Sequence, residues 1–306
     1  MYDLIIIGAG PAGITAGIYA ARKKMDTLII TKDVGGQTAW SGDIENYTGY
    51  QFISGLDLVA KFEEHIRKYA IHLKEGEEVE SLNKVRDVVY LKTNKAEYEA
   101  RTVIIASGKR SKELGVPGEK EFKNRGLTFC ATCDGPLFSG KDVAVIGGGN
   151  SALDAVLQLA RIAKKVYVIN NTISLGADAI MREKVIQANN VILFNQARVI
   201  AITGDKFVSG IKIKAQDEEK SISLDGVFVE VGLKPNSEFA PDAEKNAIGE
   251  IKVNCNNETN LPGIFAAGDV TDIQGKQIII ACGEGAKSCL SAFSYLNQHK
   301  FSDDKN

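Results

Sequence analysis

Two glycine-rich turns of nearly the same pattern constrain the fold of this chain more than any other feature. The first, GAGPAG at 8–13, follows an apolar run at 3–7 and precedes a helical pattern through residue 21 and an apolar strand at 27–30. The second, GGGNSA at 147–152, follows a strand at 142–146 and precedes a helix at 155–163 and a strand at 166–169. A strand, a glycine turn, a helix and a second strand form the unit that binds a dinucleotide. The sequence therefore predicts an α/β fold with two Rossmann-like dinucleotide-binding domains.

Each glycine of the first turn has a physical role. Gly8 allows the tight turn, Gly10 lets the backbone approach a pyrophosphate, and Gly13 lets the helix pack closely on the strand. The N–H groups at the start of the helix then face the anion. The acidic residue that usually holds the ribose is missing, because Thr31 and Lys32 follow the second strand. A plain strand-to-helix turn without a ligand is the alternative interpretation.

The second turn places Gly147, Gly149 and Ala152 at the same three positions, with alanine at the packing site. Here Asn170 stands where the acidic residue would be, and a turn without a ligand is again the alternative. Two such turns predict two bound dinucleotides. This favours a flavoenzyme that transfers reducing equivalents between a flavin and a nicotinamide.

Cys130 and Cys133 form a Cys-x-x-Cys pair just before the second turn, and this spacing favours a redox dithiol. Five cysteines in 306 residues are too few for a disulfide scaffold, and the chain starts without the basic region of a signal peptide. A reducing cytoplasm is therefore the expected location. A zinc site would need two more ligands at suitable spacing, and the sequence does not supply them, so no metal is predicted.

Asp134 directly follows the cysteine pair. The sequence leaves two interpretations open: a turn or helix-cap residue, and a proton donor or acceptor for a thiolate. Cys282 and Cys289 lie seven residues apart on a predicted closing helix that runs from about residue 283 to residue 296. We expect these two cysteines, and Cys255, to be buried in the core.

The charge balance excludes several function classes. The chain has 37 basic and 39 acidic side chains, a formal net charge of −2, so it lacks the basic excess typical of a nucleic-acid-binding protein. No apolar run approaches the ~18 residues that indicate a membrane span. Neither nucleic acid nor a membrane is therefore predicted as a partner.

Over nearly its whole length the chain resembles the low-molecular-weight bacterial thioredoxin reductases. The shared motifs are GAGPAG, Gly35-Gly36-Gln37, Glu45-Asn46-Tyr47, CATCDGPLF at 130–138, GGGNSA and FAAGD at 265–269. The stretch at 275–296 is also similar to the flavoprotein component of alkyl hydroperoxide reductase. That enzyme carries a further N-terminal thioredoxin-like region.

The resemblance implies a homodimeric flavoprotein whose two domains each have three layers of ββα type. An inserted domain at 114–246 would interrupt an FAD-binding domain made of 1–113 and 247–306. Cys133 would face the flavin, Cys130 would attack the disulfide of a partner protein, and Asp134 would handle the proton. The implied FAD contacts are Gly8, Gly10, Gly13, Gly36, Gln37, Asn46, Asp269 and Gln277.

One departure from the family pattern concerns the electron donor. Relatives that use NADPH have His-Arg-Arg-x-x-x-Arg after the second strand of the inserted domain, where this chain has Asn170, Asn171, Thr172 and Gly176. Arginine is the side chain suited to bidentate phosphate recognition, so the departure argues against NADPH. NADH, with Asn170 as a neutral ribose partner, and ferredoxin stay open as donors.

Three functions are compatible with these features. The first is a flavin-dependent disulfide reductase that acts on thioredoxin or a similar small redox protein. The second is a reductase that recycles a peroxiredoxin through a separate thioredoxin-like shuttle. The third is a non-enzymatic flavoprotein that senses redox state, which the Cys-x-x-Cys pair disfavours.

Overall fold

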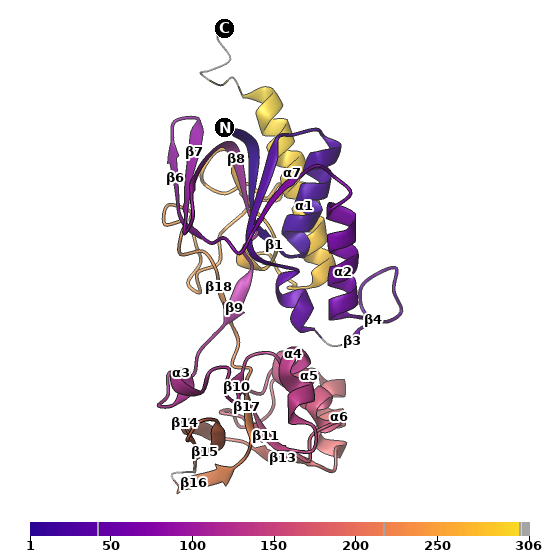
Figure 1. The fold of residues 1–306 in the computed structure, drawn as a ribbon, viewed down its shortest axis with the longest axis vertical. Helices are drawn as coiled ribbons and strands as arrows, with labels where there is room; N and C mark the ends of the chain where they lie inside the picture. Colours follow the sequence, from indigo (N-terminus) through magenta and orange to yellow (C-terminus); the bar gives the residue numbers. More distant parts are fainter. Residues whose placement is uncertain (42, 217, 300, 302–306) are drawn as a thin grey trace. The chain divides into compact units, whose positions relative to one another are not determined.

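The computed structural model describes residues 1–41, 43–216, 218–299 and 301, without the side chains of Trp40, Asp43 and Cys133. The chain forms two compact units (Figure 1). Unit 1 consists of Met1–Arg110 and Lys234–Asn306, and unit 2 of Ser111–Leu233. The chain passes between them along the paired strands β9 (Lys109–Ser111) and β18 (Leu233–Pro235).

Unit 1 has three layers, with helices on one face of a parallel sheet and an antiparallel β-meander over the other (Figure 1). The strand order is β5-β2-β1-β8-β7-β6, and β19 pairs in parallel with the end of β8. The strands are β1 (Tyr2–Ala9), β2 (Thr27–Val34), β5 (His72–Glu75), β6 (Val79–Val85), β7 (Val88–Thr93), β8 (Glu97–Ile105) and β19 (Ile264–Ala266). The helices are α1 (Pro11–Arg22), α2 (Gly55–Ile66) and α7 (Ile278–Gln298), with short elements η1 (Gly36–Trp40), β3 (Asp43–Ile44), β4 (Ile53–Ser54) and η3 (Gly268–Val270).

The apolar run of β1 is buried on both faces, as expected for a central parallel strand. Leu4 and Ile6 pack with α1, α2 and α7, whereas Ile5 and Ile7 pack on the side of β6 and β7. These alternating contacts fix the carboxyl end of β1, where the first glycine turn begins.

Unit 2 repeats the layered plan with a parallel sheet in the order β10-β17-β11-β12-β13. Val143 and Val145 of β11 pack with α5 and α6, whereas Ala144 and Ile146 face the antiparallel strands β14, β15 and β16. The strands are β10 (Leu127–Thr128), β11 (Asp142–Ile146), β12 (Lys165–Ile169), β13 (Val191–Phe194), β14 (Ala197–Gly204), β15 (Val208–Ala215), β16 (Glu218–Ser223) and β17 (Gly226–Val229). The helices are α3 (Glu119–Phe122), α4 (Ala131–Asp134), η2 (Gly135–Phe138), α5 (Asn150–Ala160) and α6 (Ala179–Gln187).

The predicted α/β class with two Rossmann-like domains is confirmed, and β11 has the predicted bounds. Two helices begin earlier than expected. Helix α5 begins at Asn150 because the glycine turn itself supplies its N-cap, Gly149. Helix α7 begins at Ile278, within three isoleucines whose β-branched side chains are weaker helix formers.

The predicted inserted domain ends at 246, whereas compact unit 2 ends at Leu233. The intervening segment belongs to unit 1 because Ala240 and Ala243 are buried in the core cluster beside β6 and β7. The backbone N–H of Leu82 in β6 also donates to the carbonyl of Phe239 at 2.9 Å. Within the described residues, no helix has the length and apolar composition needed to cross a bilayer.

Candidate functional site

The first glycine turn requires glycine at two positions for steric reasons. Gly8 has φ +105°, and a Cβ there would lie 2.4 Å from the carbonyl oxygen of Ala106 at the end of β8. A Cβ on Gly13 would lie 1.9 Å from the carbonyl oxygen of Gly8. Both distances are far below van der Waals contact. The start of α1 therefore packs against the strand as closely as backbone allows.

The same turn leaves an open approach to the start of α1. A Cβ on Gly10, the N-cap residue, would have no atom nearer than the Gly35 carbonyl oxygen at 4.0 Å. Gly10 supplies no side-chain cap, whereas α2 has Ser54, whose hydroxyl accepts from the N–H of Asp57 at 3.1 Å. The uncapped N–H groups of α1 are thus available to an anion, which fits a pyrophosphate.

A second glycine segment lies beside this turn. The N–H of Gly35 donates to the carbonyl of Ala9 at 2.8 Å, and a Cβ on Gly36 would approach the Cα of Gly10 to 3.6 Å. The amide of Gln37 donates to the carbonyl of Lys109 at 3.2 Å. The structure therefore joins the GGQ motif to the first turn.

Asn46 and Gln277, predicted as cofactor contacts from distant parts of the sequence, meet at the start of α7. The amide of Asn46 donates to Oε1 of Gln277 at 3.1 Å. Next to them, the Tyr47 hydroxyl lies 3.7 Å from the Cys282 sulfur, and burial together with Cys282 raises the pKa of Tyr47.

Asp269 lies near a buried charge cluster that the sequence did not identify. Burial raises the pKa of Asp269, and Lys276 and Lys109 oppose this effect. Oε1 of Glu250 lies 2.8 Å from the Lys109 ammonium and 3.2 Å from that of Lys276, while the Asn246 amide donates to its Oε2 at 2.6 Å. Burial alone would raise the pKa of Glu250, but these contacts hold it at about 2.

The second turn has the same backbone form. Gly147 has φ +139°, and a Cβ there would lie 2.2 Å from the carbonyl oxygen of Glu230 just after β17. A Cβ on Gly149 would meet nothing within 4 Å, so the start of α5 is open to an anion. Ala152 is fully buried against the strand, as the packing position predicts.

Asn170 is only 2% exposed, and its amide group is bonded within unit 2. Its Nδ2 donates to the carbonyl of Thr172 at 3.1 Å and to Oδ1 of Asn195 at 2.8 Å. Its Oδ1 accepts from the Thr172 hydroxyl at 2.9 Å. A Cβ on Gly148 would lie 2.3 Å from this oxygen, so Asn170 supports the turn itself. Its predicted contact with a ribose stays a prediction.

Glu230 is a titratable residue at the second turn that the sequence analysis missed. Burial raises its carboxyl pKa to about 7, although a hydrogen bond with Ser151 lowers it, and the nearby charge of Asp154 raises it further. Its place, directly after a buried strand and opposite a glycine turn, is the signal that could have identified it. The second turn therefore carries a group that titrates near neutral pH.

Cys130 is disulfide-bonded and directly precedes α4. Its partner in the predicted pair, Cys133, has its backbone in α4, and its side chain lies outside the described part of the structure. The N–H of Cys130 donates to the Thr128 hydroxyl at 3.1 Å, and this hydroxyl donates to Oδ2 of Asp134. A single hydroxyl thus links Asp134 to the backbone of Cys130.

The other cysteines divide into two groups. Cys282 and Cys289 are 9% and 0% exposed, which confirms the prediction for the closing helix, and burial raises the pKa of Cys289 to about 12. The prediction for Cys255 was wrong, because this free thiol is exposed. It lies in a turn closed by the N–H of Asn257 donating to the carbonyl of Asn254, and its neighbours in the sequence, Asn254 and Asn256, are polar.

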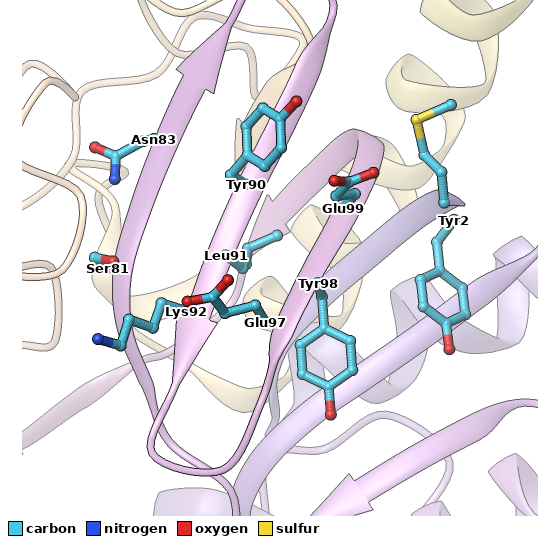
Figure 2. A pocket seen from close by; sticks show the side chains of 10 residues that line it. Tyr2, Ser81, Asn83, Tyr90, Leu91, Lys92, Glu97, Tyr98 and Glu99 are labelled. Carbon is cyan, nitrogen blue, oxygen red and sulfur yellow. The ribbon is translucent and has the colours of Figure 1, made fainter.

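The side chains drawn in Figure 2 line a hollow on unit 1. Its volume is about 510 Å³. Side chains of β6, β7 and β8, such as Tyr90, Lys92 and Glu97, line it. Among the described residues, its lining includes none of those predicted for catalysis or cofactor binding. The candidate sites are therefore the two turns and the dithiol loop.

The chain is similar to known proteins over nearly its whole length. The profile of the family described as pyridine nucleotide-disulphide oxidoreductase matches residues 2–285. The chain is 43% identical to an alkyl hydroperoxide reductase component of Pseudomonas aeruginosa over 303 residues, which cover 96% of this chain and 58% of that protein. It is 42% identical to an NADH dehydrogenase of Bacillus subtilis over 299 residues, which cover 96% of this chain and 58% of that protein.

Among solved structures, the thioredoxin reductase of Lactococcus lactis matches with a TM-score of 0.92 and 33% identity, covering 98% of this chain and 100% of that one. The chain thus spans less than two thirds of the two curated relatives but the whole of this solved structure.

Proposed function

Because the chain belongs to the pyridine nucleotide-disulphide oxidoreductase family, we propose that it is a disulfide reductase that holds FAD in unit 1. Cys130 and Cys133 of unit 2 form the dithiol that reduces the disulfide of thioredoxin or a similar small redox protein. When bound, the flavin supplies the two-electron chemistry that connects a donor to a dithiol.

The observation that carries the proposal is the set of contacts around Cys130. This cysteine is disulfide-bonded, and Thr128 links its backbone to the carboxyl group of Asp134. A carboxyl group next to a cysteine that exchanges disulfides can take up and return the proton of a thiol. This supports the second of the two interpretations of Asp134.

Disulfide exchange then proceeds on the chain's own residues. In the reduced pair, Asp134 takes the proton of the Cys130 thiol, and the resulting thiolate attacks one sulfur of the partner disulfide while the other partner sulfur leaves as a thiolate that takes this proton from Asp134. Asp134 then takes the proton of the Cys133 thiol, whose thiolate attacks the Cys130 sulfur of the mixed disulfide, and the second partner thiolate leaves and takes that proton. The pair loses two electrons and two protons, and the partner gains both.

The residues of unit 1 fit the dinucleotide that this reaction needs. The uncapped start of α1 would hold the pyrophosphate, since Gly10 leaves it open and Gly36 lies beside it. Gln37 and the Asn46–Gln277 pair would orient the rest of the cofactor through their amides. Asp269 would accept from a hydroxyl group, as its half-buried carboxyl allows.

NADH is the donor that the second turn supports best. The segment 170–176 reads NNTISLG and has no charged side chain, so it lacks the arginines that would hold the 2′-phosphate of NADPH. A relative that is 42% identical carries the name NADH dehydrogenase. The first turn would hold FAD and the second NADH.

An anaerobic titration of the FAD-loaded protein with NADH, NADPH and reduced ferredoxin, followed by flavin absorbance, tests this assignment. NADH should bleach the flavin, and NADPH should need roughly 10- to 100-fold higher concentration, the effect of an unpaired phosphate charge. Bleaching by NADPH at equal concentration would contradict the assignment. If reduced ferredoxin alone bleached the flavin, ferredoxin and not NADH would be the donor.

A second candidate function is recycling of a peroxiredoxin through a separate thioredoxin-like shuttle. It is favoured by the identity to the alkyl hydroperoxide reductase component, of which this chain spans 58%. Turnover with NADH and a peroxiredoxin, with and without an added thioredoxin-like protein, separates the two functions. A flavin that no donor reduces would instead favour a redox sensor.

A further inference from the structure

A stripe of polar side chains runs along α5 between the second glycine turn and the dithiol loop. Ser151, Asp154 and Gln158 lie three and four residues apart, so they share one face of the helix. The opposite face, which includes Leu153 and Val156, is fully buried in the core of unit 2. Among the described residues, the stripe is thus the only polar face of α5 between Ser151 and Gln158.

At the end of the stripe, Gln158 contacts Thr132, one of the two residues between the dithiol cysteines. The Thr132 hydroxyl donates to Oε1 of Gln158 at 2.9 Å. The amide Nε2 of Gln158 donates to Oδ2 of Asp154 at 2.7 Å. A hydroxyl group has one proton, so Thr132 cannot donate to Gln158 and to a thiolate at the same time.

Asp154 sets the direction of this chain of hydrogen bonds. An ionised carboxylate only accepts, so it requires the amide nitrogen of Gln158 on its side. The amide oxygen then points to Thr132, which must act as the donor. Reversal would place the Gln158 oxygen against the Asp154 carboxylate, where neither group has a proton to give.

Charged and titratable groups lie around both ends of the chain. Glu230, just after β17, lies near the charge of Asp154 and bonds with Ser151, and burial raises its carboxyl pKa to about 7. Asp134, in α4, lies at the other end and accepts from Thr128. The dithiol loop and the second turn are therefore connected by contacts inside unit 2.

We propose that Gln158 is a positioning residue that, under the control of Asp154, keeps the Thr132 hydroxyl from donating to the reduced dithiol. The proposal rests on the proposed role of Cys130 and Cys133 as the working pair. Without Gln158 the hydroxyl turns to a neighbouring thiolate and stabilises it by a charge-assisted hydrogen bond. The wild-type dithiol therefore keeps its protons to a higher pH than the loop alone would allow.

The test measures the thiol pKa directly. The purified protein is reduced with dithiothreitol, freed of reductant without oxygen, and alkylated briefly with iodoacetamide between pH 5 and pH 10. Mass spectrometry then gives the alkylation of Cys130 and Cys133 at each pH. In Gln158→Leu the lower midpoint should fall by about one pH unit, the effect of one hydrogen bond to a charged group.

Two controls come from the same chain. Gln187→Leu removes an exposed glutamine at the end of α6 in the same unit and should leave the midpoint unchanged. The exposed thiol of Cys255 in unit 1 is an internal reference, and its profile should be the same in every variant.

A second set of variants identifies the hydroxyl as the cause. Thr132→Val alone should leave the midpoint within about 0.3 units of wild type, since the hydroxyl is already occupied. In the Thr132→Val background, Gln158→Leu should no longer shift it. An unchanged midpoint in Gln158→Leu, or an equal shift in both backgrounds, would overturn the proposal.

The assay needs neither an electron donor nor a protein partner. If the protein fails to reduce any disulfide substrate, the alkylation midpoints still decide the role of Gln158. If the midpoints contradict the proposal while turnover is normal, the proposed function stands and only the role of Gln158 is lost. Should Gln158→Leu not fold, Thr132→Val carries the test, because a shift of one unit in that variant contradicts the proposal.

Discussion

At the first glycine turn the neighbouring groups are backbone and the neutral hydroxyl of Thr31, whereas at the second they include a titratable carboxyl group. A Cβ on Gly10 would lie 4.0 Å from the carbonyl oxygen of Gly35, and a Cβ on Gly8 would clash with the backbone of Ala106. The second turn has Asn170 directly against Gly148, and the carboxyl group of Glu230 bonds with Ser151. The two turns have the same geometry, but the second has a carboxyl group with a pKa of about 7 bonded to one of its own residues, whereas the side chain bonded to the first is the hydroxyl of Thr31.

This difference indicates different kinds of binding. A turn surrounded by backbone and a neutral hydroxyl holds its ligand independently of pH, which suits a resident cofactor. A turn beside a carboxyl group with a pKa near 7 changes its charge in the physiological range, which suits a ligand that comes and goes. The following variants test whether the two units divide their roles in this way.

The largest effect is expected in unit 2. Cys130→Ser should lower turnover with a protein disulfide by at least about a thousandfold, because it removes the attacking thiolate. Flavin reduction by NADH should be retained, since the groups proposed to hold FAD lie in unit 1. Stopped-flow absorbance and a disulfide-reduction assay measure the two steps separately, with Cys255→Ser as the control thiol. Full turnover in Cys130→Ser would contradict the proposed function.

The next effect concerns the packing position of each turn. Gly13→Ala places a Cβ 1.9 Å from the Gly8 carbonyl oxygen, so the turn must open, and we expect a loss of about 3 kcal/mol with loss of FAD. The reverse change, Ala152→Gly, should cost only about 1 kcal/mol, the difference in helix propensity. Flavin content after purification and thermal unfolding measure both. Equal effects of the two variants would mean that the turns are equally tight.

A smaller effect is expected at the buried charge cluster of unit 1. Lys109→Met removes one of the two ammonium groups that contact Glu250 and should lower the free energy of unfolding by about 2 kcal/mol. The loss is smaller than for a buried charge left without any partner, because Lys276 still contacts Glu250. The pKa of Glu250 is about 2 in the folded state against its ordinary 4.5, so its contribution is present above pH 4.5 and lost as the pH falls toward 2. Denaturant unfolding between pH 3 and pH 7 should show a flatter acid limb in the variant, and an unchanged limb would contradict this.

The smallest effect has the opposite sign with pH. The folded-state pKa of Glu230 lies above its ordinary 4.5, at about 7, so its contribution is present below pH 4.5 and lost as the pH rises through 7. Glu230→Gln should therefore stabilise the protein by roughly 1 kcal/mol at pH 8 and by less at pH 5. Unfolding of both proteins at the two pH values measures this. A destabilisation that is larger at pH 8 would mean that the carboxylate makes contacts worth more than its burial costs.

The sequence predicted those parts of the fold that follow from the pattern of a few neighbouring residues. The buried strand 142–146 and both glycine turns follow from short-range patterns, and the structure has them as expected. The antiparallel layer β14–β16 was implied by the family resemblance and not by the residue pattern, because β16 is largely exposed and alternates too weakly to be distinguished from a loop.

The residues that sequence reasoning missed owe their roles to tertiary contacts. Glu230, Gln158 and Glu250 belong to no motif, and their importance comes from burial and from partners far away in the chain. Asn170 shows the reverse case: its position matched a known ligand site, while the structure bonds its amide within unit 2. A sequence pattern can thus locate a site without giving the state of each side chain.

The pairing of β19 with β8 has a consequence for how the chain folds as it is synthesised. Ile264–Ala266 pairs with Val103–Ile105, and all of unit 2 lies between these segments. A nascent chain therefore completes unit 2 while the end of β8 still lacks its neighbour and α7 has not been made. During that interval unit 1 presents an open apolar sheet edge, the kind of surface that chaperones bind and that aggregates when left uncovered.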